Sequence, residues 1–209
     1  DVEHFYPKSE LWKLSDDAAE RGQEEDWSAK VRGRKRDVLC EGGFWWMAYD
    51  WKNYLLSCLV CNQKWKLAYF PLQEKDPSLP PVEDSKYTPL LLNPFQGPDP
   101  RRHLEFGPDG EVKARDGSLL GQTTIDVCGL DRANLRKKRL EKAKKVHALV
   151  SQLLKADVPS DEFDRVALEI WEAGTIEYEH SGLVKTVLHQ FGGLSWTELR
   201  RIVDDIKKR

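Results

Sequence analysis

The sequence predicts an α+β fold, with short strands in the first part of the chain and helices in the last. Apolar and polar residues alternate at 1–6 as in a strand, and 103–106 and 111–114 flank a Pro-Asp-Gly turn as in a hairpin. In the final third, apolar residues recur at helical spacing. These patterns divide the chain into a mixed region, 1–130, and a helical region, 131–209.

Composition places only broad limits on function. The chain has 209 residues and a net charge of −2, from 33 lysines and arginines against 35 aspartates and glutamates. No apolar run approaches the ~20 residues of a membrane-spanning helix, and no signal peptide is visible. We therefore expect a cytoplasmic protein that makes no contact with membranes. Its four unevenly spaced cysteines favour metal-bound or free thiols over a disulfide scaffold.

The mixed region opens with the strand, and a polar, charged insertion follows it at 8–43, where a short helix is expected at 15–21. Six aromatic residues come next, and packing in a small core is favoured over base stacking for them. A further helix should run from Asn62 to about Tyr69, where Pro71 stops it, before a short buried segment at 90–92. The six aromatic residues are Phe44, Trp45, Trp46, Tyr49, Trp51 and Tyr54.

The helical region begins with a long helix, which Asp131 can cap and which should extend to about Lys155. Its first half is rich in lysine and arginine and is expected to be exposed, whereas its second half is apolar enough to pack. Basic residues also cluster at 30–36. Either basic run can contact nucleic acid or simply be solvated, and charge alone does not decide between these.

The tail after the long helix predicts a small helical unit. Ser160 is expected to cap a helix at 161–173 that Gly174 closes, a second helix should span 183–191, and a capping box at 195–198 should open the last one. A unit of this size is small to be stable alone. It must therefore dock, either on the rest of this chain or on another protein.

Metal-binding residue types concentrate in two short segments. Cys58 and Cys61 form a Cys-x-x-Cys pair, whose spacing lets two thiolates reach one ion, as in half of a structural zinc site. Glu3 and His4 are adjacent at a strand end, so they can serve two roles around one site. Asn62 directly follows the second cysteine and can offer a carbonyl oxygen to a harder metal ion.

The segments around these residues resemble the HNH endonucleases, and within them the effectors of retron and Septu-type anti-phage systems. The resemblance runs from residue 1 to about 140, and it implies a ββα-metal nuclease core within 1–130 followed by a mainly α-helical region. The matching segments are Glu-His-Phe-Tyr-Pro-Lys at 3–8, Tyr-Asp-Trp-Lys-Asn-Tyr-Leu-Leu-Ser-Cys at 49–58, Phe-Pro-Leu at 70–72, Pro-Leu-Leu-Leu-Asn-Pro at 89–94, His-Leu-Glu-Phe at 103–106 and Thr-Ile-Asp-Val-Cys-Gly-Leu-Asp-Arg at 124–132.

The resemblance implies metal-dependent hydrolysis of phosphodiester bonds in DNA. It assigns His4 as the general base, a role that suits an imidazole titrating near neutral pH. Asn53 would hold the loop of His4 through hydrogen bonds. Glu3 and Asn62 would bind Mg²⁺ or Mn²⁺, which prefer oxygen ligands and retain several waters.

The same resemblance implies substrate and zinc contacts. Lys64 and Lys66 are the candidates for binding phosphate as point charges. Cys58 and Cys61 are the candidate ligands of a structural zinc ion. Related enzymes usually carry a second Cys-x-x-Cys upstream of the first strand, and we expect that pair in a segment preceding this sequence, in which it is absent.

Two alternatives remain open from the sequence. A non-catalytic zinc-knuckle module that binds nucleic acid or protein would need the two cysteines but neither the acid–histidine pair nor Asn62. Cleavage of RNA by the same chemistry is also possible. Similarity to the Septu-type effectors further implies a regulatory ATPase partner, which the tail at 156–209 or the basic run at 30–36 would recruit.

Overall fold

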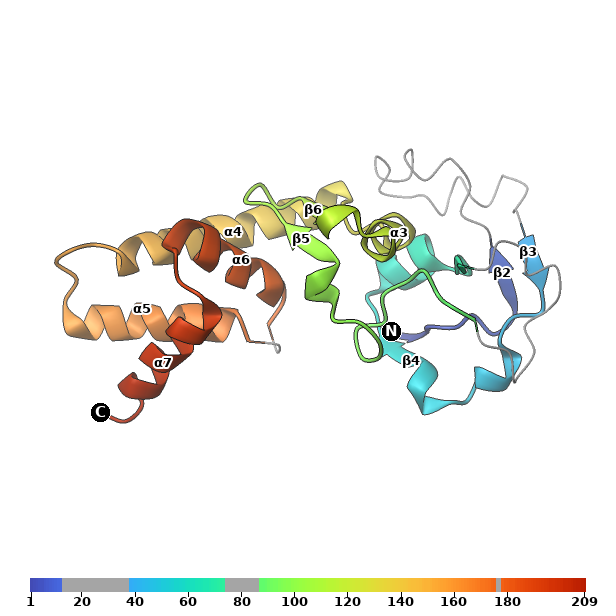
Figure 1. Cartoon of the computed structure of the whole chain (residues 1–209), viewed down its shortest axis with the longest axis horizontal. Helices are drawn as coiled ribbons and strands as arrows, with labels where there is room; N and C mark the ends of the chain where they lie inside the picture. The colour runs from blue at the N-terminus through green and yellow to red at the C-terminus, as the bar shows by residue number, and fades with distance from the viewer. Residues whose placement is uncertain (13–37, 74–86, 176–177) are drawn as a thin grey trace. The chain divides into compact units, whose positions relative to one another are not determined.

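Short strands and turns make up one unit of the computed structural model, and helices make up most of the other (Figure 1). The first unit comprises residues 1–105 and 113–133, and the second comprises 106–112 and 134–209. The mixture of small sheets and helices confirms the predicted α+β class. The residues that the structure describes are 1–12, 38–73, 87–175 and 178–209.

The first strand pair carries the acid–histidine pair. Strand β1 (Val2–His4) pairs in antiparallel fashion with β4 (Tyr54–Leu56), so the first residue of each strand lies opposite the last residue of the other. Because side chains alternate along a strand, the four terminal residues of this pair share one face. Glu3 and its partner Leu55 point to the opposite face.

A second antiparallel pair lies at the base of the polar insertion. Strand β2 (Glu10–Trp12) pairs with β3 (Val38–Glu41), so both edges of the segment predicted as a surface insertion at 8–43 are strands. The amides of Gly42 and Gly43 both donate to the carbonyl of Ser9, at 3.0 and 2.9 Å, and extend this closure. The helix expected at 15–21 lies outside the described residues.

The helix after the cysteine pair is shorter than predicted. It is a π-helical segment, Cys61–Lys66, in which the amide of Leu67 donates to the carbonyl of Asn62 at 3.1 Å. Leu67 then takes a left-handed φ of 47°. The next carbonyl, of Ala68, accepts from the amide of Trp12 at 2.9 Å. Pairing with β2 therefore ends the helix before the proline expected to stop it.

The prediction of an aromatic core is correct for only part of the cluster. Phe44 is buried and Trp46 packs partly against the same core, but Trp45, Tyr49 and Trp51 are largely exposed. Trp45 and Trp51 begin two short 3₁₀ turns, Trp45–Met47 and Trp51–Asn53, and Tyr49 lies between them in the segment that joins β3 to β4. The buried residues of this core are Phe5, Leu11, Phe44, Phe70, Leu72, Leu91 and Val127.

Helix α3 (Leu119–Cys128) covers the Cys61–Lys66 helix. The hydroxyl of Ser118 caps it by accepting from the amide of Gly121 at 3.1 Å, and Gly129 ends it with a left-handed φ of 57°. The hairpin predicted before this helix is confirmed as β5 (Leu104–Phe106) and β6 (Val112–Ala114), which contribute residues to both units.

Gly129→Ala is expected to destabilise the first unit strongly. A Cβ at this position would lie 2.1 Å from the ring of Trp65, which is fully buried. Gly117→Ala is a matched control, because Gly117 also has a positive φ, of 68°, but an added Cβ meets nothing within 4 Å. Because of the clash with Trp65, Gly129→Ala should lower the free energy of unfolding by about 1–3 kcal/mol more than Gly117→Ala, which shares only the backbone strain. Equal urea midpoints for the two variants would contradict this account.

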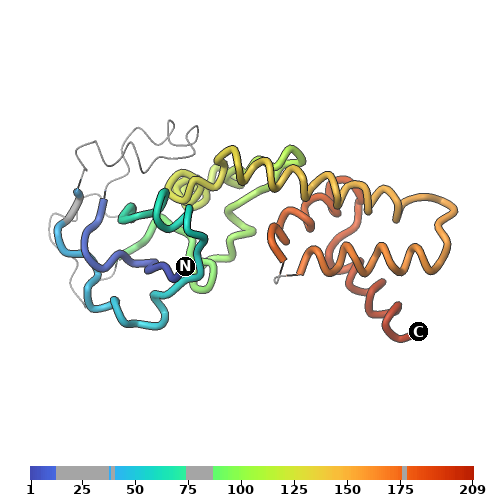
Figure 2. Tube along the Cα trace, turned by 180° about the vertical axis from the view of Figure 1, so that it is seen from behind, coloured from blue at the N-terminus to red at the C-terminus, as the bar shows by residue number. Residues whose placement is uncertain are grey.

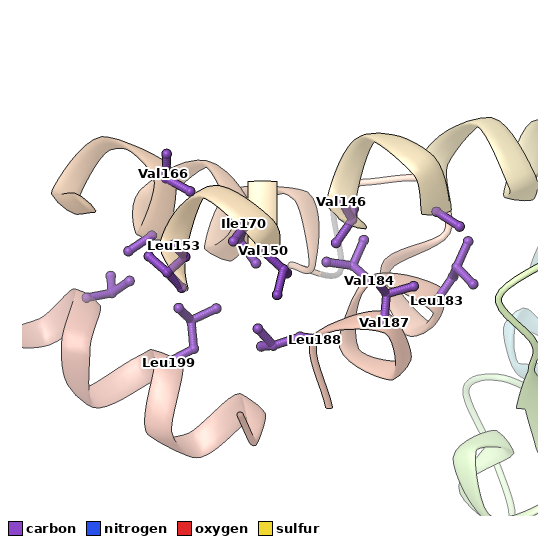
Figure 3. Close-up of a cluster of buried hydrophobic side chains, with 13 residues drawn as sticks. Val146, Val150, Leu153, Val166, Ile170, Leu183, Val184, Val187, Leu188 and Leu199 are labelled. Carbon is purple, nitrogen blue, oxygen red and sulfur yellow. The ribbon is translucent and has the colours of Figure 1, made fainter. Parts of the chain in front are cut away.

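The second unit contains α4 (Ala133–Leu153) except for its first residue, and also α5 (Ser160–Ala173), α6 (Ser181–Gly192) and α7 (Trp196–Ile206). Figure 2 shows the chain reversing direction between α4 and α5. The apolar second half of α4 packs with the three later helices, as predicted for docking within the chain (Figure 3). Their shared core contains Ala143, Val146, Val150, Leu153, Val166, Ala167, Ile170, Leu183, Val184, Val187, Leu188, Leu199 and Val203.

Two local predictions for this unit are wrong, whereas the closing glycine of α5, Gly174, and the capping box of α7 are confirmed. Ser160 does not cap α5, whose N-cap is Pro159 without a side-chain hydrogen bond. The basic half of α4 is not wholly exposed, because Arg139 is buried and donates to the carbonyl of Gly110 at 2.6 Å. The capping box of α7 is present, with reciprocal bonds between Ser195 and Glu198.

Among the helices in the described ranges, none combines the length and apolar content needed to cross a bilayer.

Candidate active site

Glu3, His4 and Asn62 line one open pocket of about 450 Å³. The first two come from the end of β1, and Asn62 comes from the Cys61–Lys66 helix. Lys8 and Glu10 line the same pocket, although sequence patterns did not single them out. Their signal was weak because both lie at the start of a segment dense in charged residues. The pocket therefore combines acid, base, amide and cationic groups.

The imidazole of His4 has a defined orientation. Its Nε2 atom lies 3.0 Å from the carbonyl oxygen of Ala48, which also accepts from the Tyr54 hydroxyl at 2.6 Å. A carbonyl oxygen can only accept, so Nε2 of the neutral ring must carry the proton. Nδ1 has no hydrogen-bond partner among the described residues. Its lone pair is therefore available to take a proton.

Asn53 connects the chain after β1 with the turn before β4. Its Oδ1 accepts from the amide of Tyr6 at 2.6 Å, and its Nδ2 donates to the carbonyls of Tyr6 and Met47 at 3.0 and 3.1 Å. The side chain is fully buried. Met47 immediately precedes the residue whose carbonyl orients His4. Asn53 therefore ties the chain just after His4 to the residue that precedes Ala48.

Glu3 forms a buried ion pair with Lys66. The Lys66 Nζ lies 2.6 Å from the Glu3 Oε1 and also donates to the carbonyl of His4 at 2.9 Å. A buried charge requires such compensation. Of the two lysines predicted to contact phosphate, Lys66 is thus engaged with the acid–histidine pair. Lys64 is half-buried and does not line the pocket.

The pocket residues fit the oxygen preference of Mg²⁺ or Mn²⁺. The Asn62 Nδ2 donates to the carbonyl of Val2 at 3.3 Å, so its Oδ1 remains available as a ligand. The Glu3 carboxylate, whose Oε1 accepts from Lys66, is the other candidate oxygen ligand. Within the described ranges, no group of three or more His, Cys, Asp or Glu residues could hold a metal ion. An ion here would therefore rely on water and substrate phosphate for its remaining ligands.

Cys58 and Cys61 converge on the guanidinium of Arg132. Its Nη2 atom lies 3.7 Å from the Cys58 Sγ and 3.4 Å from the Cys61 Sγ, while Nη1 donates to the carbonyls of Cys128 and Gly129. The Cys61 amide also donates to the Cys58 Sγ at 3.2 Å. Two thiols aimed at one point fit half of a structural zinc site. The sequence placed Arg132 in a family-like segment, but it did not indicate a contact with Cys61, 71 residues away.

The two thiols differ in their acidity. Burial alone would raise the pKa of Cys58, but hydrogen bonds from Cys61 and the charge of Arg132 together hold that pKa below its ordinary value. Burial and the hydrogen bond with Cys58 raise the pKa of Cys61, against the opposing charge of Arg132. Cys58 is therefore the thiol that loses its proton first.

Replacing Cys58 or Cys61 with serine is expected to lower stability rather than only slow a reaction. Structural zinc contributes directly to folding free energy, and serine is a much poorer ligand than a thiolate. Thermal unfolding and elemental analysis of the purified proteins measure this. Cys128→Ser is the matched control, because it also removes a thiol but not a candidate zinc ligand, and Cys128 packs partly against the core. The prediction is wrong if the unmodified protein folds without zinc and has the same melting temperature as the Cys58 and Cys61 variants.

Comparison with known proteins gives one informative similarity. The Septu protein PtuB of Bacillus mycoides (strain KBAB4) is 38% identical over 113 residues, which are 54% of this chain and 38% of that protein. The chain thus spans well under half the length of this relative. No protein-family model matches the chain, and no solved structure matches it. The similarity supports a relationship between this chain and the Septu proteins.

Proposed function

We propose that this chain is a metal-dependent HNH endonuclease that hydrolyses phosphodiester bonds in DNA. The observation that carries the proposal is the convergence of Glu3, His4 and Asn62 on one pocket. Glu3 and His4 lie on β1, which pairs with β4, and Asn62 lies on the helix that follows β4. A strand pair followed by a helix is the order of a ββα-metal site. The oriented imidazole adds support, since a general base needs a defined free nitrogen.

In the proposed reaction, the Nδ1 of His4 takes a proton from the water that attacks phosphorus. Ala48 holds the imidazole through Nε2, and Asn53 holds Ala48's neighbour and the chain after β1. Fixing the base in this way removes reorganisation that would otherwise slow the reaction. Lys66 keeps the Glu3 carboxylate at the pocket and partly offsets its charge. Lys8, which is exposed at the rim, is placed to attract phosphate.

Glu3 and Asn62 would hold Mg²⁺ or Mn²⁺. The chemistry that such an ion supplies when bound is polarisation of the phosphate and stabilisation of the departing oxygen. Cys58 and Cys61 would provide two ligands of a structural zinc ion, with Arg132 compensating the thiolate charge. Zinc would then tie the helix that carries Asn62 to the segment that supplies its remaining ligands, while Arg132 links the two thiols to the carbonyls of Cys128 and Gly129.

We also propose a role in Septu anti-phage defence, on the strength of the similarity to PtuB. In such a system the nuclease would be the effector, and a regulatory ATPase would be its partner. The apolar faces of α5, α6 and α7 are already buried against α4, so contact with an ATPase would have to use other surfaces. Exposed apolar residues of the second unit, such as Leu154 and Phe191, remain available to a partner.

Cleavage of supercoiled plasmid DNA tests the proposed activity. The purified chain is incubated with Mg²⁺ or Mn²⁺, and nicked and linear products are separated on agarose gels. We expect nicking that requires the divalent ion and that needs a higher Mg²⁺ concentration in Asn62→Ala. Binding of DNA without cleavage in any divalent ion would instead favour a zinc-knuckle binding module.

A further inference from the structure

An apolar groove of about 730 Å³ lies beside the candidate active site. Trp51 and Phe95 form part of its walls and are 86% and 70% exposed. Val2 and Leu56, at the paired ends of β1 and β4, also line it and are exposed. So large an apolar surface costs free energy in water, and such surfaces usually mark a binding site.

One wall of the groove is Tyr54, whose ring contacts that of His4. Its strand residues Val2, Tyr54 and Leu56 share one face of the β1–β4 pair with His4, as the register requires. A series of edge-to-face ring contacts follows the same path. The rings of Trp51 and Tyr54 are 5.7 Å apart, and those of Tyr54 and His4 are 5.0 Å apart. A molecule seated in the groove would thus be separated from the proposed general base by the ring of Tyr54.

Hydrogen bonds hold the two aromatic walls in place without a ligand. The Oδ1 of buried Asn93 accepts from the amides of Phe95 and Gln96 at 2.9 and 3.1 Å. The Gln96 side chain then donates to the carbonyl of Lys52 at 3.0 Å, next to Trp51. The loop that carries Phe95 is therefore tied to the turn that carries Trp51. A preformed site of this kind saves the entropy of ordering on binding.

We propose that this groove binds unpaired nucleotides of the substrate, with bases stacked on Trp51 and Phe95. The inference rests on the proposed nuclease function and names the form of its substrate. Aromatic side chains stack on any base, whereas a duplex keeps its base faces covered and presents mainly phosphate. The exposed ammonium of Lys52, at the groove wall, suits the phosphates that connect such bases.

The location of the groove favours nucleotides over a protein partner. A protein side chain could fill the same apolar space, but a bound protein would obstruct the approach of substrate to His4. A nucleic-acid strand has no such conflict, because its phosphates are what His4 must reach. A stacked base near Trp51 would place the adjoining backbone toward the pocket that Glu3, His4 and Asn62 line.

Fluorescence anisotropy with labelled oligonucleotides tests the inference. His4→Ala protein is used throughout, so that the probe is not cleaved, and the probes are single-stranded DNA, single-stranded RNA and a DNA duplex of the same sequence. We expect a single strand to bind more tightly than the duplex. Trp51→Ala and Phe95→Ala should each weaken that binding about tenfold or more, whereas Trp51→Phe should retain most of it.

Tyr178→Ala is the matched control, since Tyr178 is an exposed aromatic residue of the other unit and its removal should leave binding unchanged. Circular dichroism checks that every variant is folded, which the exposure of both wall residues favours. Equal affinity of the parent and both alanine variants, or tighter binding of the duplex, would overturn the inference. Single-strand binding that depends on Trp51 in a protein unable to cut plasmid would uphold the inference and refute the nuclease.

Discussion

His4→Ala is expected to lower DNA cleavage by about 10²–10⁴-fold and to leave the protein folded. The substitution removes the nitrogen that would take the proton of the attacking water. It also removes one of the two hydrogen bonds to the carbonyl of Ala48, but the Tyr54 hydroxyl remains on that oxygen at 2.6 Å. The local structure should therefore survive. Initial rates of plasmid nicking at saturating Mg²⁺ measure the effect.

His189→Ala is the matched control for His4→Ala, because His189 is exposed on α6 in the other unit. It should cut DNA at the rate of the unmodified protein. Comparison of the melting temperatures of both variants separates loss of a base from loss of fold. A folded His4→Ala protein that retains full activity would remove His4 from the mechanism, and with it the proposed HNH chemistry.

Asn53→Ala is expected to destabilise the first unit by about 3–5 kcal/mol. The side chain is fully buried and satisfies both the amide and the carbonyl of Tyr6. Alanine would leave these two backbone groups without their partner and would create a cavity. Because the third contact, to Met47, positions the turn before β4, the variant should also lose activity before it unfolds. Urea denaturation followed by tryptophan fluorescence measures the free energy of unfolding.

Asn62→Ala provides the comparison for Asn53→Ala. Asn62 is only half-buried and makes a single side-chain bond of 3.3 Å, so its removal should cost less than about 1 kcal/mol. Similar unfolding free energies for the two variants would show that the buried network around Asn53 contributes little. A large difference would show that the Asn53 amide supports the fold and that the Asn62 amide contributes little to it.

Local patterns in the sequence were sufficient to predict most of the regular structure. The alternation at the start of the chain corresponds to β1, the Pro-Asp-Gly turn to the β5–β6 hairpin, and the helical spacing after Asp131 to α4. The capping box at Ser195 was recognisable because its two partners are three residues apart. In each case the deciding interactions are short-range, so the residues that make them are neighbours in the sequence.

The remaining features depend on contacts between residues distant in sequence. The Cys61–Lys66 helix ends early because Ala68 pairs with Trp12, and no local pattern indicates that pairing. Likewise, Lys66 is of a residue type that commonly binds phosphate, yet it pairs with Glu3, 63 residues away. Adjacent residues Glu3 and His4, by contrast, could be recognised together. The sequence therefore indicated which residue types form the candidate site, but not which of these side chains are paired with one another.

The β2–β3 stem affects how freely the segment between its two strands can change in length and sequence. His4 and Asn53 are separated by a long stretch of chain, but the stem and the bonds from Gly42 and Gly43 to Ser9 bring its two ends together at a fixed spacing. Lengthening a loop that is already closed at its base adds only a small entropic cost. Residues between the two strands can therefore be gained, lost or exchanged over evolutionary time with little mechanical effect on His4. In the proposed nuclease, such a position suits the acquisition of new binding specificity while the chemistry stays constant.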